Sequence, residues 1–362
     1  MALDPFADLV TLTRALCDVP SVSGDERELA DQVQAALEDL GYLEVLRDGD
    51  AVVARTHLGR ERRVVLAGHL DTVPVAGNLP SELREEPDGS GPVVWGRGTV
   101  DMKAGDAVLL ALAAAVREPS VDVTYVFYDA EEVEADRNGL GRLVARHPDW
   151  VAGDMAVLGE PTAGALEGGC NGTLRVEVVV RGTAAHSARS WLGVNAVHGA
   201  AEVLARLVAY SPREVEVDGL TYREGLNAVG IRGGIAGNVI PDECVVTVNY
   251  RFAPSRTEAQ AQAHVREVFD GYEVRVTDSA PGARPGLDRP EAIELADVVA
   301  RLTGRPPRAK QGWTDVARFA GLGVPAVNFG PGDPSLAHAD DERTPVSDLD
   351  VCFDALRTWL TS

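Results

Sequence analysis

The feature that most constrains the fold is an alternation of strongly apolar, strand-length runs with segments of helical periodicity. Such apolar runs are typical of strands buried on both faces of a sheet, and the periodic segments are typical of helices packed against it. The strand-like runs occupy 51–56, 63–69, 121–128 and 154–161, and the helix-like segments occupy 26–40, 103–117 and 137–147. This order predicts an α/β fold in which helices cover a central mixed sheet.

The pattern changes near residue 172, where "TLRVEVVVRG" alternates apolar and polar residues as a half-exposed antiparallel strand does. The segments that follow predict the order β-α-β-β-α-β, a ferredoxin-like α+β sheet with helices on one face. Its helices are expected at 193–210 and 256–269, and its further strands at 226–234, 243–252 and 272–278. We therefore expect a discontinuous first domain, 1–172 and 284–362, interrupted by an inserted domain at 173–283.

Size and charge exclude several classes of protein. A chain of 362 residues exceeds the usual limit of a single core, which favours two domains. The formal charge is −22, from 34 basic and 56 acidic residues, and this argues against nucleic acid as a partner. The longest apolar runs, such as 107–116, are shorter than the roughly 20 residues that cross a membrane.

The four cysteines, Cys17, Cys170, Cys244 and Cys352, are widely spaced and form no CxxC motif. Neither a disulfide framework nor a thiolate zinc site is expected from such spacing. The first residues, "MALDPFADLV", carry acids and no basic segment, so we expect no secretion signal and a cytoplasmic location.

Metal-binding side chains recur where apparent strands end. They are His69 and Asp71 in "GHLDTVP", Asp101 in "GRGTVDMKAG", Glu131 and Glu132 in "DAEE", Glu160 in "LGEP", and His338 in "AHADDE". In an open α/β sheet, ligands bind at the carboxyl ends of the strands, so the fold would gather these residues. Taken singly, such residues more often belong to a turn, a helix cap, a solvated surface or the core; their joint pattern favours a site.

Imidazoles and carboxylates without thiolates suit zinc, cobalt or manganese. A bridging carboxylate holds two such ions about 3.5–4 Å apart in hydrolytic sites. One further carboxylate must stay off the metals to act as a base. The adjacent Glu131 and Glu132 offer this division, because neighbouring residues on an extended chain point in different directions.

The motifs together resemble the M20 family of metallopeptidases and amidohydrolases, and they run from "GHLDTVP" to "AHADDE" with "GTAAHSA" and "NVIPDE" between them. The resemblance implies a zinc-peptidase-like catalytic domain with two divalent metal ions, and an inserted lid that also forms a homodimer. It implies that Asp101 bridges the two ions. His69 and Glu160 would complete one ion's ligands, and Glu132 and His338 the other's.

The same resemblance assigns the remaining roles. Glu131 would be the general base, and Asp71 would hold the His69 ring in one tautomer. His186 would donate to the tetrahedral oxyanion in the partner subunit's site. Asn238 and Arg251 would bind a substrate carboxylate, with an ordinary surface strand residue as the alternative for Arg251.

The substrate is expected to be a small acyl amino acid. "GWTDVARF" and "VNFGPGDPSLAHADDE" are most similar to the branch that hydrolyses N-succinyl-LL-2,6-diaminopimelate, which would place Thr314 and Gly312 in the pocket. That branch commonly has arginine where this chain has Cys170-Asn171, so one cationic contact is missing unless Arg175 or Arg189 supplies it. Another N-acyl amino acid deacylase, such as an acetylornithine deacetylase, a di- or carboxypeptidase, and a non-catalytic binding protein stay open as alternatives.

Overall fold

The computed structural model describes residues 3–86 and 88–362, and the chain divides into two compact units. The first unit contains the residues up to Gly168, then Pro285–Arg308 and Asp315–Ser362. The inserted unit contains Gly169–Arg284 together with Ala309–Thr314. The short segment 309–314 therefore groups with the inserted unit, whereas the sequence analysis placed it in the domain that resumes at residue 284.

The first unit is built on a mixed sheet with the strand order β1-β2-β6-β3-β7-β18-β8-β17. Its strands are β1 (Glu44–Asp48), β2 (Ala51–Arg55), β6 (Asp122–Tyr128), β3 (Arg63–His69), β7 (Met155–Leu158), β18 (Ala326–Asn328), β8 (Glu167–Gly168) and β17 (Arg308–Ala309). Strand β3 runs parallel to β6 and β7, and β7 runs parallel to β18. The carboxyl ends of these strands therefore meet at one edge of the sheet.

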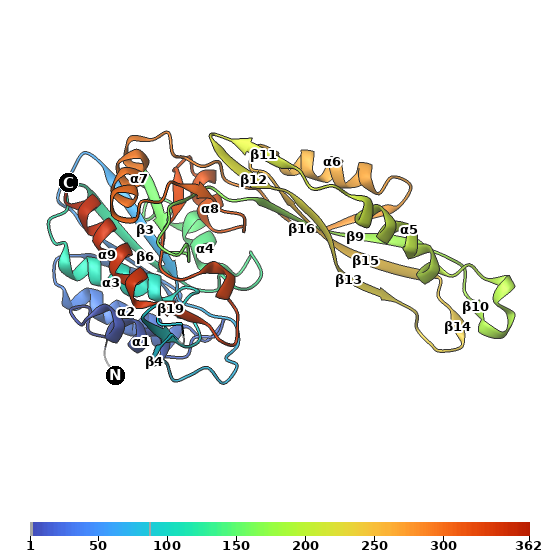
Figure 1. Cartoon of the computed structure of the whole chain (residues 1–362), viewed down its shortest axis with the longest axis horizontal. Helices are drawn as coiled ribbons and strands as arrows, with labels where there is room; N and C mark the ends of the chain where they lie inside the picture. Colours follow the sequence, from blue (N-terminus) through green and yellow to red (C-terminus); the bar gives the residue numbers. More distant parts are fainter. Residues whose placement is uncertain (1–2, 87) are drawn as a thin grey trace. The chain divides into compact units, whose positions relative to one another are not determined.

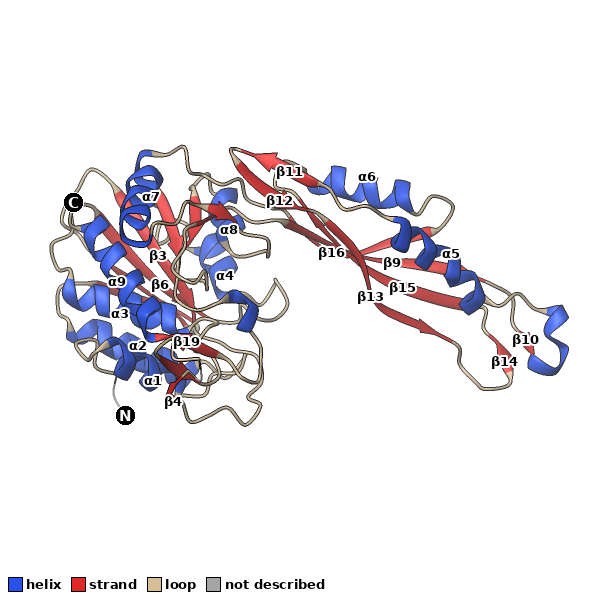
Figure 2. Cartoon of the chain, in the orientation of Figure 1, coloured by secondary structure: helices blue, strands red, loops and turns tan. Residues whose placement is uncertain are grey.

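Helices cover both faces of this sheet, which is why β3 and β6 are buried along almost their whole length. Figures 1 and 2 show α3 and α9 on one side of β3 and β6, and α4 and α8 on the other. The helices are α1 (Leu9–Cys17), α2 (Arg27–Asp39), α3 (Lys103–Ala115), α4 (Gly139–Arg146), α7 (Pro290–Thr303), α8 (Val316–Gly321) and α9 (Val346–Leu360). The α/β class predicted from the sequence is confirmed.

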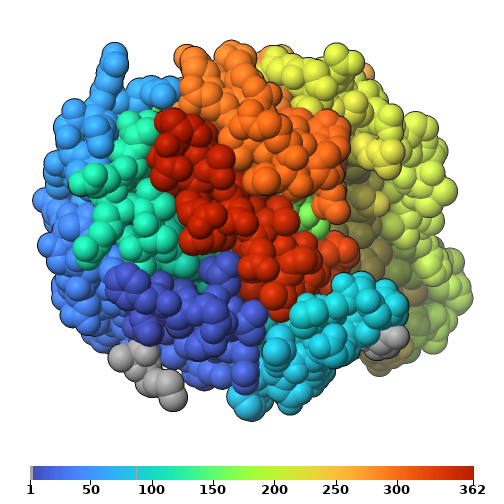
Figure 3. Space-filling model, turned by 60° about the vertical axis from the view of Figure 1, so that its left-hand side comes forward, coloured from blue at the N-terminus to red at the C-terminus, as the bar shows by residue number. Residues whose placement is uncertain are grey.

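The C-terminal helix closes this unit. Helix α9 packs against both α1 and α3, so the last residues of the chain cover the first helix (Figure 3, red against dark blue). A small antiparallel sheet of order β19-β5-β4 lies beside α9 and contains β4 (Glu82–Glu85), β5 (Pro92–Trp95) and β19 (Arg343–Pro345). Among the described residues, no helix combines the length and apolarity needed to cross a membrane.

The inserted unit is an antiparallel sheet of order β13-β15-β9-β16 with α5 (Ala196–Ala209) and α6 (Glu258–Val268) on one face (Figure 1). The strands are β9 (Gly172–Arg181), β13 (Gly225–Gly233), β15 (Glu243–Phe252) and β16 (Glu273–Ala280). Alternate residues of β9, including Leu174 and Val176, are buried beneath the helices, and the residues between them lie on the uncovered face.

Short elements extend this unit. Strands β10 (Ala185–His186) and β14 (Val239–Ile240) form a ladder next to the 3₁₀ helix η1 (Ser187–Leu192), and β11 (Glu214–Val217) and β12 (Leu220–Arg223) form a hairpin. A second 3₁₀ turn, η2 (Pro334–Leu336), precedes β19 in the first unit.

Candidate metal centre

Strand β3 ends at His69, whose side chain is 1% exposed. Its Nδ1 lies 3.0 Å from the backbone carbonyl oxygen of Asp71, which only accepts hydrogen bonds, so Nδ1 carries the proton. Nε2 lies 3.1 Å from Oδ1 of Asp101. Burial opposes a charge on the ring, but the Asp101 and Asp71 carboxylates outweigh it and raise the pKa of His69 well above its ordinary value.

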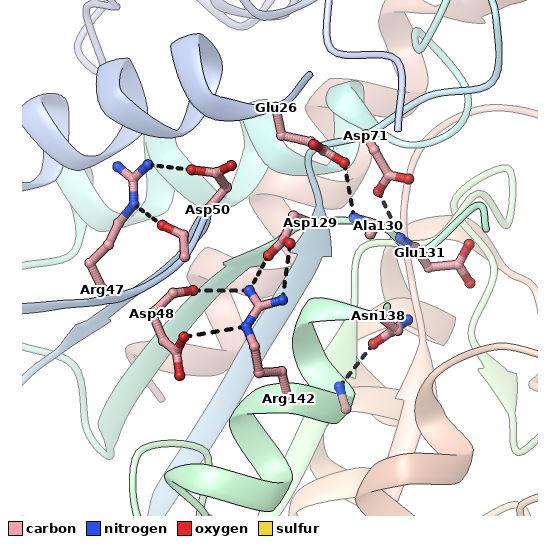
Figure 4. A network of polar contacts seen from close by, with 12 residues as sticks. Glu26, Arg47, Asp48, Asp50, Asp71, Asp129, Ala130, Glu131, Asn138 and Arg142 are labelled. Carbon is pink, nitrogen blue, oxygen red and sulfur yellow. Dashed lines mark hydrogen bonds and ion pairs between the residues drawn. The ribbon is translucent and has the colours of Figure 1, made fainter. Parts of the chain in front are cut away.

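The fully buried Asp71 carboxylate anchors the loop that carries the paired glutamates. It accepts hydrogen bonds from the Ser23 hydroxyl at 2.7 Å and from the backbone N–H groups of Glu131 and Glu132 at 2.9 and 3.1 Å. Figure 4 shows the bond from Glu131. Its Oδ1 lies 3.5 Å from Nδ1 of His69, farther than the Asp71 carbonyl oxygen. The ring is thus held mainly by the backbone of Asp71, and the carboxylate mainly holds the loop.

Two further contacts fix this loop, and Figure 4 shows them side by side. The buried Glu26 accepts the N–H of Ala130 at 3.2 Å, and Arg142 binds Asp129 at 2.6 Å. Ala130 has a φ of 57°, in the left-handed region that residues with a Cβ rarely adopt. These hydrogen bonds hold the turn that presents the next residue, Glu131.

Glu131 and Glu160 lie in the same acidic environment. Burial raises the pKa of Glu131 well above its ordinary value, and the nearby charges of Asp315, Glu160 and Glu132 raise it further, against His69. Glu160 follows β7 and is 6% exposed. A carboxyl group with a raised pKa is suited to exchange protons near neutral pH.

Asp101 and His338 are far apart in the sequence but close together in the fold. Nε2 of His338 lies 2.9 Å from Oε1 of Glu132 and 3.4 Å from Oδ2 of Asp101. Hydrogen bonds to Asp101 and Glu132 raise the pKa of His338 to about 10. One ligand atom each from His69, Asp101 and Glu132 lie within 4.8 Å of one another.

A buried ion pair that the sequence did not reveal joins the two segments. Arg97 and Glu342 are 3% and 1% exposed, and Nη1 of Arg97 lies 2.8 Å from Oε2 of Glu342. The other oxygen, Oε1, accepts the N–H groups of Val100 and Asp101 at 2.9 and 3.0 Å. Arg97 also donates to the carbonyl of Ala339, the neighbour of His338, at 3.2 Å. The pair therefore positions both Asp101 and His338.

The chemistry of this cluster fits divalent cations. Carboxylates and imidazoles converge there, and mutual repulsion among the acids favours a cation between them. All four cysteines are free and buried, and none belongs to the cluster of His69, Asp101 and Glu132. Nitrogen and oxygen ligands without sulfur suit zinc, cobalt and manganese.

The other predicted residues belong to the inserted unit. His186 is exposed on β10, opposite Val239 of β14, and the N–H of Ser187 donates to the carbonyl of Asn238 at 2.9 Å. His186 and Asn238 are thus brought together. Arg251 lies on β15. Thr314 is 4% exposed and Gly312 is exposed, both in the segment 309–314.

A cluster of carboxylates and histidines at the carboxyl edge of an α/β sheet, with the buried His69 at its base, is typical of metal-dependent hydrolases. The chain belongs to the peptidase family M20/M25/M40, whose model matches residues 65–362.

Two relatives are similar over nearly the whole chain. A Mycobacterium tuberculosis protein, provisionally named the succinyl-diaminopimelate desuccinylase DapE, is 56% identical over 361 residues, which are 99% of each chain. The succinyl-diaminopimelate desuccinylase of Corynebacterium glutamicum is 47% identical and covers 99% of this chain and 98% of its own.

Solved structures share the fold. A tripeptidase of Staphylococcus aureus superimposes with a TM-score of 0.79 at 22% identity and covers 97% of this chain and 96% of its own. An M20 family metallo-carboxypeptidase of Sulfolobus solfataricus has a TM-score of 0.75 at 17% identity and covers 98% of both chains.

Proposed function

We propose that the protein hydrolyses N-succinyl-LL-2,6-diaminopimelate to succinate and LL-2,6-diaminopimelate, a step in the synthesis of lysine and of cell-wall precursors. The observation that carries this proposal is full-length identity of 56% and 47% to relatives that bear the name of this activity. The cluster of His69, Asp101 and Glu132 supports it, because these side chains could hold the divalent cation that acts as the electrophile in amide hydrolysis. The proposed base, Glu131, directly precedes Glu132.

The proposed cofactors are two divalent ions, most simply zinc, with cobalt or manganese as alternatives. Asp101 would bridge them; His69 and Glu160 would hold one, and Glu132 and His338 the other. When bound, such ions polarise the amide carbonyl and lower the pKa of water.

Glu131 takes a proton from the attacking water and passes it to the leaving nitrogen, so that the amine departs neutral. Its half-buried position and raised pKa support this role. Asp71 keeps Glu131 in place through the hydrogen bond from its backbone N–H. Thr314 and Gly312 would line the substrate pocket.

We also propose a homodimer through the inserted unit, which would act as lid and dimerisation domain. Strand β13 is an edge of its sheet and exposes Val229 and Ile231 by 59% and 56%. The loop after it exposes Ile235, and helix α5 exposes Val208, both by 88%. Apolar side chains on an unpaired strand edge favour pairing with another chain. In the dimer, His186 would donate to the oxyanion of the partner subunit's site, and Asn238 would bind substrate beside it.

The four free, buried cysteines are consistent with a reducing compartment, and we propose a cytoplasmic location.

The test is release of free amine by the zinc-loaded protein from N-succinyl-LL-diaminopimelate, with N-acetylornithine and a dipeptide in parallel. A strong preference for the succinyl compound is expected. Turnover of the acetyl compound or the dipeptide alone would move the protein to a neighbouring deacylase or peptidase, and no turnover would favour a binding protein on this scaffold.

A further inference from the structure

The uncovered face of the inserted sheet carries two neighbouring arginines. Arg251 of β15 lies opposite Thr173 of β9, and Arg175 of β9 lies opposite Asn249 of β15. Because residues two apart on a strand share a face, all four side chains lie on the same surface. Asn249 donates to the Thr173 hydroxyl at 3.1 Å, which keeps the centre of this patch polar and ordered.

The two guanidinium groups are close enough to repel each other. Burial lowers the pKa of Arg251, and the charge of Arg175 lowers it further. Asp278, opposite Arg175 on β16, supplies one negative charge against these two positive ones. The patch therefore has a net positive charge in a chain whose total is −22.

Other arginines on this sheet are already paired. Arg181 binds Glu243 and Glu273, and Arg232 binds Glu177 at 2.7 Å. Within the described part of the chain, the guanidinium groups of Arg175 and Arg251 form neither a hydrogen bond nor an ion pair, so both remain available to an anionic ligand.

The two residues just before Gly172, the first residue of β9, are Cys170 and Asn171, which are uncharged and buried. Cys170 and Asn171 are 0% and 1% exposed. The Cys170 thiol contacts the carbonyl of Thr314 at 3.7 Å, and the Asn171 amide donates to the carbonyls of Arg223 and Gln311 at 3.0 Å. Both side chains thus hold the inserted unit together, and the first cation along β9 is Arg175.

Connectivity places this patch at the end of the sheet where the chain enters and leaves the inserted unit. Strand β9 begins three residues after the inserted unit begins at Gly169, and β16 ends at Ala280, four residues before that stretch ends at Arg284. Arg175 lies four residues after Asn171, which is bonded to the segment that contains Thr314.

We propose that Arg175, acting with Arg251, binds the free carboxylate of the succinyl group and so determines the preference for N-succinyl over N-acetyl substrates. A guanidinium offers two parallel N–H donors to a carboxylate, and a pair of them suits a ligand that carries several carboxylates. This inference rests on the proposed function and adds to it the residue that recognises the succinyl group of the substrate.

The test compares wild type, Arg175→Gln, Arg175→Lys and the matched control Arg181→Gln from the same strand, each zinc-loaded. The substrates are N-succinyl-LL-diaminopimelate and its N-acetyl analogue, which lacks the succinyl carboxylate. Arg175→Gln should lower kcat/KM for the succinyl substrate about 10- to 100-fold, mainly through KM, and change that for the acetyl analogue less than about threefold. Arg175→Lys should retain part of the preference, and Arg181→Gln all of it.

Equal losses on both substrates, or no loss on the succinyl one, would overturn the role of Arg175. If wild type fails to cleave the succinyl substrate, the proposed function fails, and calorimetry with succinate then tests the patch separately. Weaker succinate binding by Arg175→Gln, by about tenfold or more, would support the patch as a carboxylate site. Equal binding by both proteins, or none by wild type, would reject it.

Discussion

Removing the charge of Glu342 is the perturbation for which the structure gives the clearest magnitude. In Glu342→Gln, the amide oxygen still accepts the N–H groups of Val100 and Asp101, at 2.9 and 3.0 Å in the wild type. In the wild type, Nη1 of Arg97 lies 2.8 Å from a carboxylate oxygen of Glu342. In the variant the amide nitrogen takes the place of that oxygen, so two hydrogen-bond donors face each other. Arg97 is 3% exposed and is left with a buried, uncompensated charge. Breaking such a buried pair costs about 3–5 kcal/mol.

For a unit of this size, that loss lowers Tm by roughly 6–20 °C. The assay is thermal and urea unfolding of the metal-free protein, with Glu82→Gln as control because the Glu82–Arg84 pair is exposed and is worth at most about 1 kcal/mol. Metal affinity should also fall about 10- to 100-fold, since Arg97 holds the neighbour of His338. A Glu342→Gln protein as stable as the control would refute the account.

Glu131→Gln should reduce turnover by about 10²–10⁴-fold while metal content, measured by atomic emission, is unchanged; loss of metal would mean that Glu131 is a ligand. Burial alone would raise the pKa of Asp122, but hydrogen bonds from the Thr56 hydroxyl and from backbone N–H groups, Leu58 among them, leave it below its ordinary value of 3.8. Because the folded-state pKa is lower than the unfolded-state pKa, this stabilisation is full above about pH 5 and is lost as the pH falls below that. Asp122→Asn should therefore cost about 1–3 kcal/mol at pH 7, and progressively less from pH 5 to pH 3, in urea unfolding. Ile231→Asp should convert a dimer to a monomer in light scattering, and an unchanged mass would argue against β13 as the interface.

Periodicity was sufficient to predict the long elements. The helix expected at 26–40 is α2, Arg27–Asp39, and the strand expected at 243–252 is β15. Local chemistry moved some ends: the helix expected from residue 193 begins at Ala196, because the Asn195 side chain caps the N–H groups of Val197 and His198. The hairpin of β11 and β12 was not predicted, since each strand has only four residues.

The residues that support the site could not be predicted, because their partners are distant in sequence. Glu26 holds Ala130 across 104 positions, and Glu342 holds Arg97 across 245. Each is an ordinary charged residue in its own segment, and only the folded chain shows that it is buried and bonded. The predicted ligands His69, Glu132 and Glu160 were recognisable because they end or follow apolar strands, whereas these supporting residues follow no local pattern.

The motif glycines show how the fold delivers ligands from separate segments. A Cβ on Gly105, four residues after Asp101, would lie 2.2 Å from the carbonyl oxygen of Gly159, and a Cβ on Gly330 would lie 2.1 Å from the same atom. Real Cβ atoms do not make contacts that short. Helix α3 and the chain after β18 can therefore pack against this carbonyl only because Gly105 and Gly330 have no side chain. Gly159 directly precedes Glu160. The glycines of "DMKAG", "LGEP" and "NFGPG" therefore form one packed unit, and a substitution at Gly105 or Gly330 should shift the adjoining Glu160 without altering any predicted ligand.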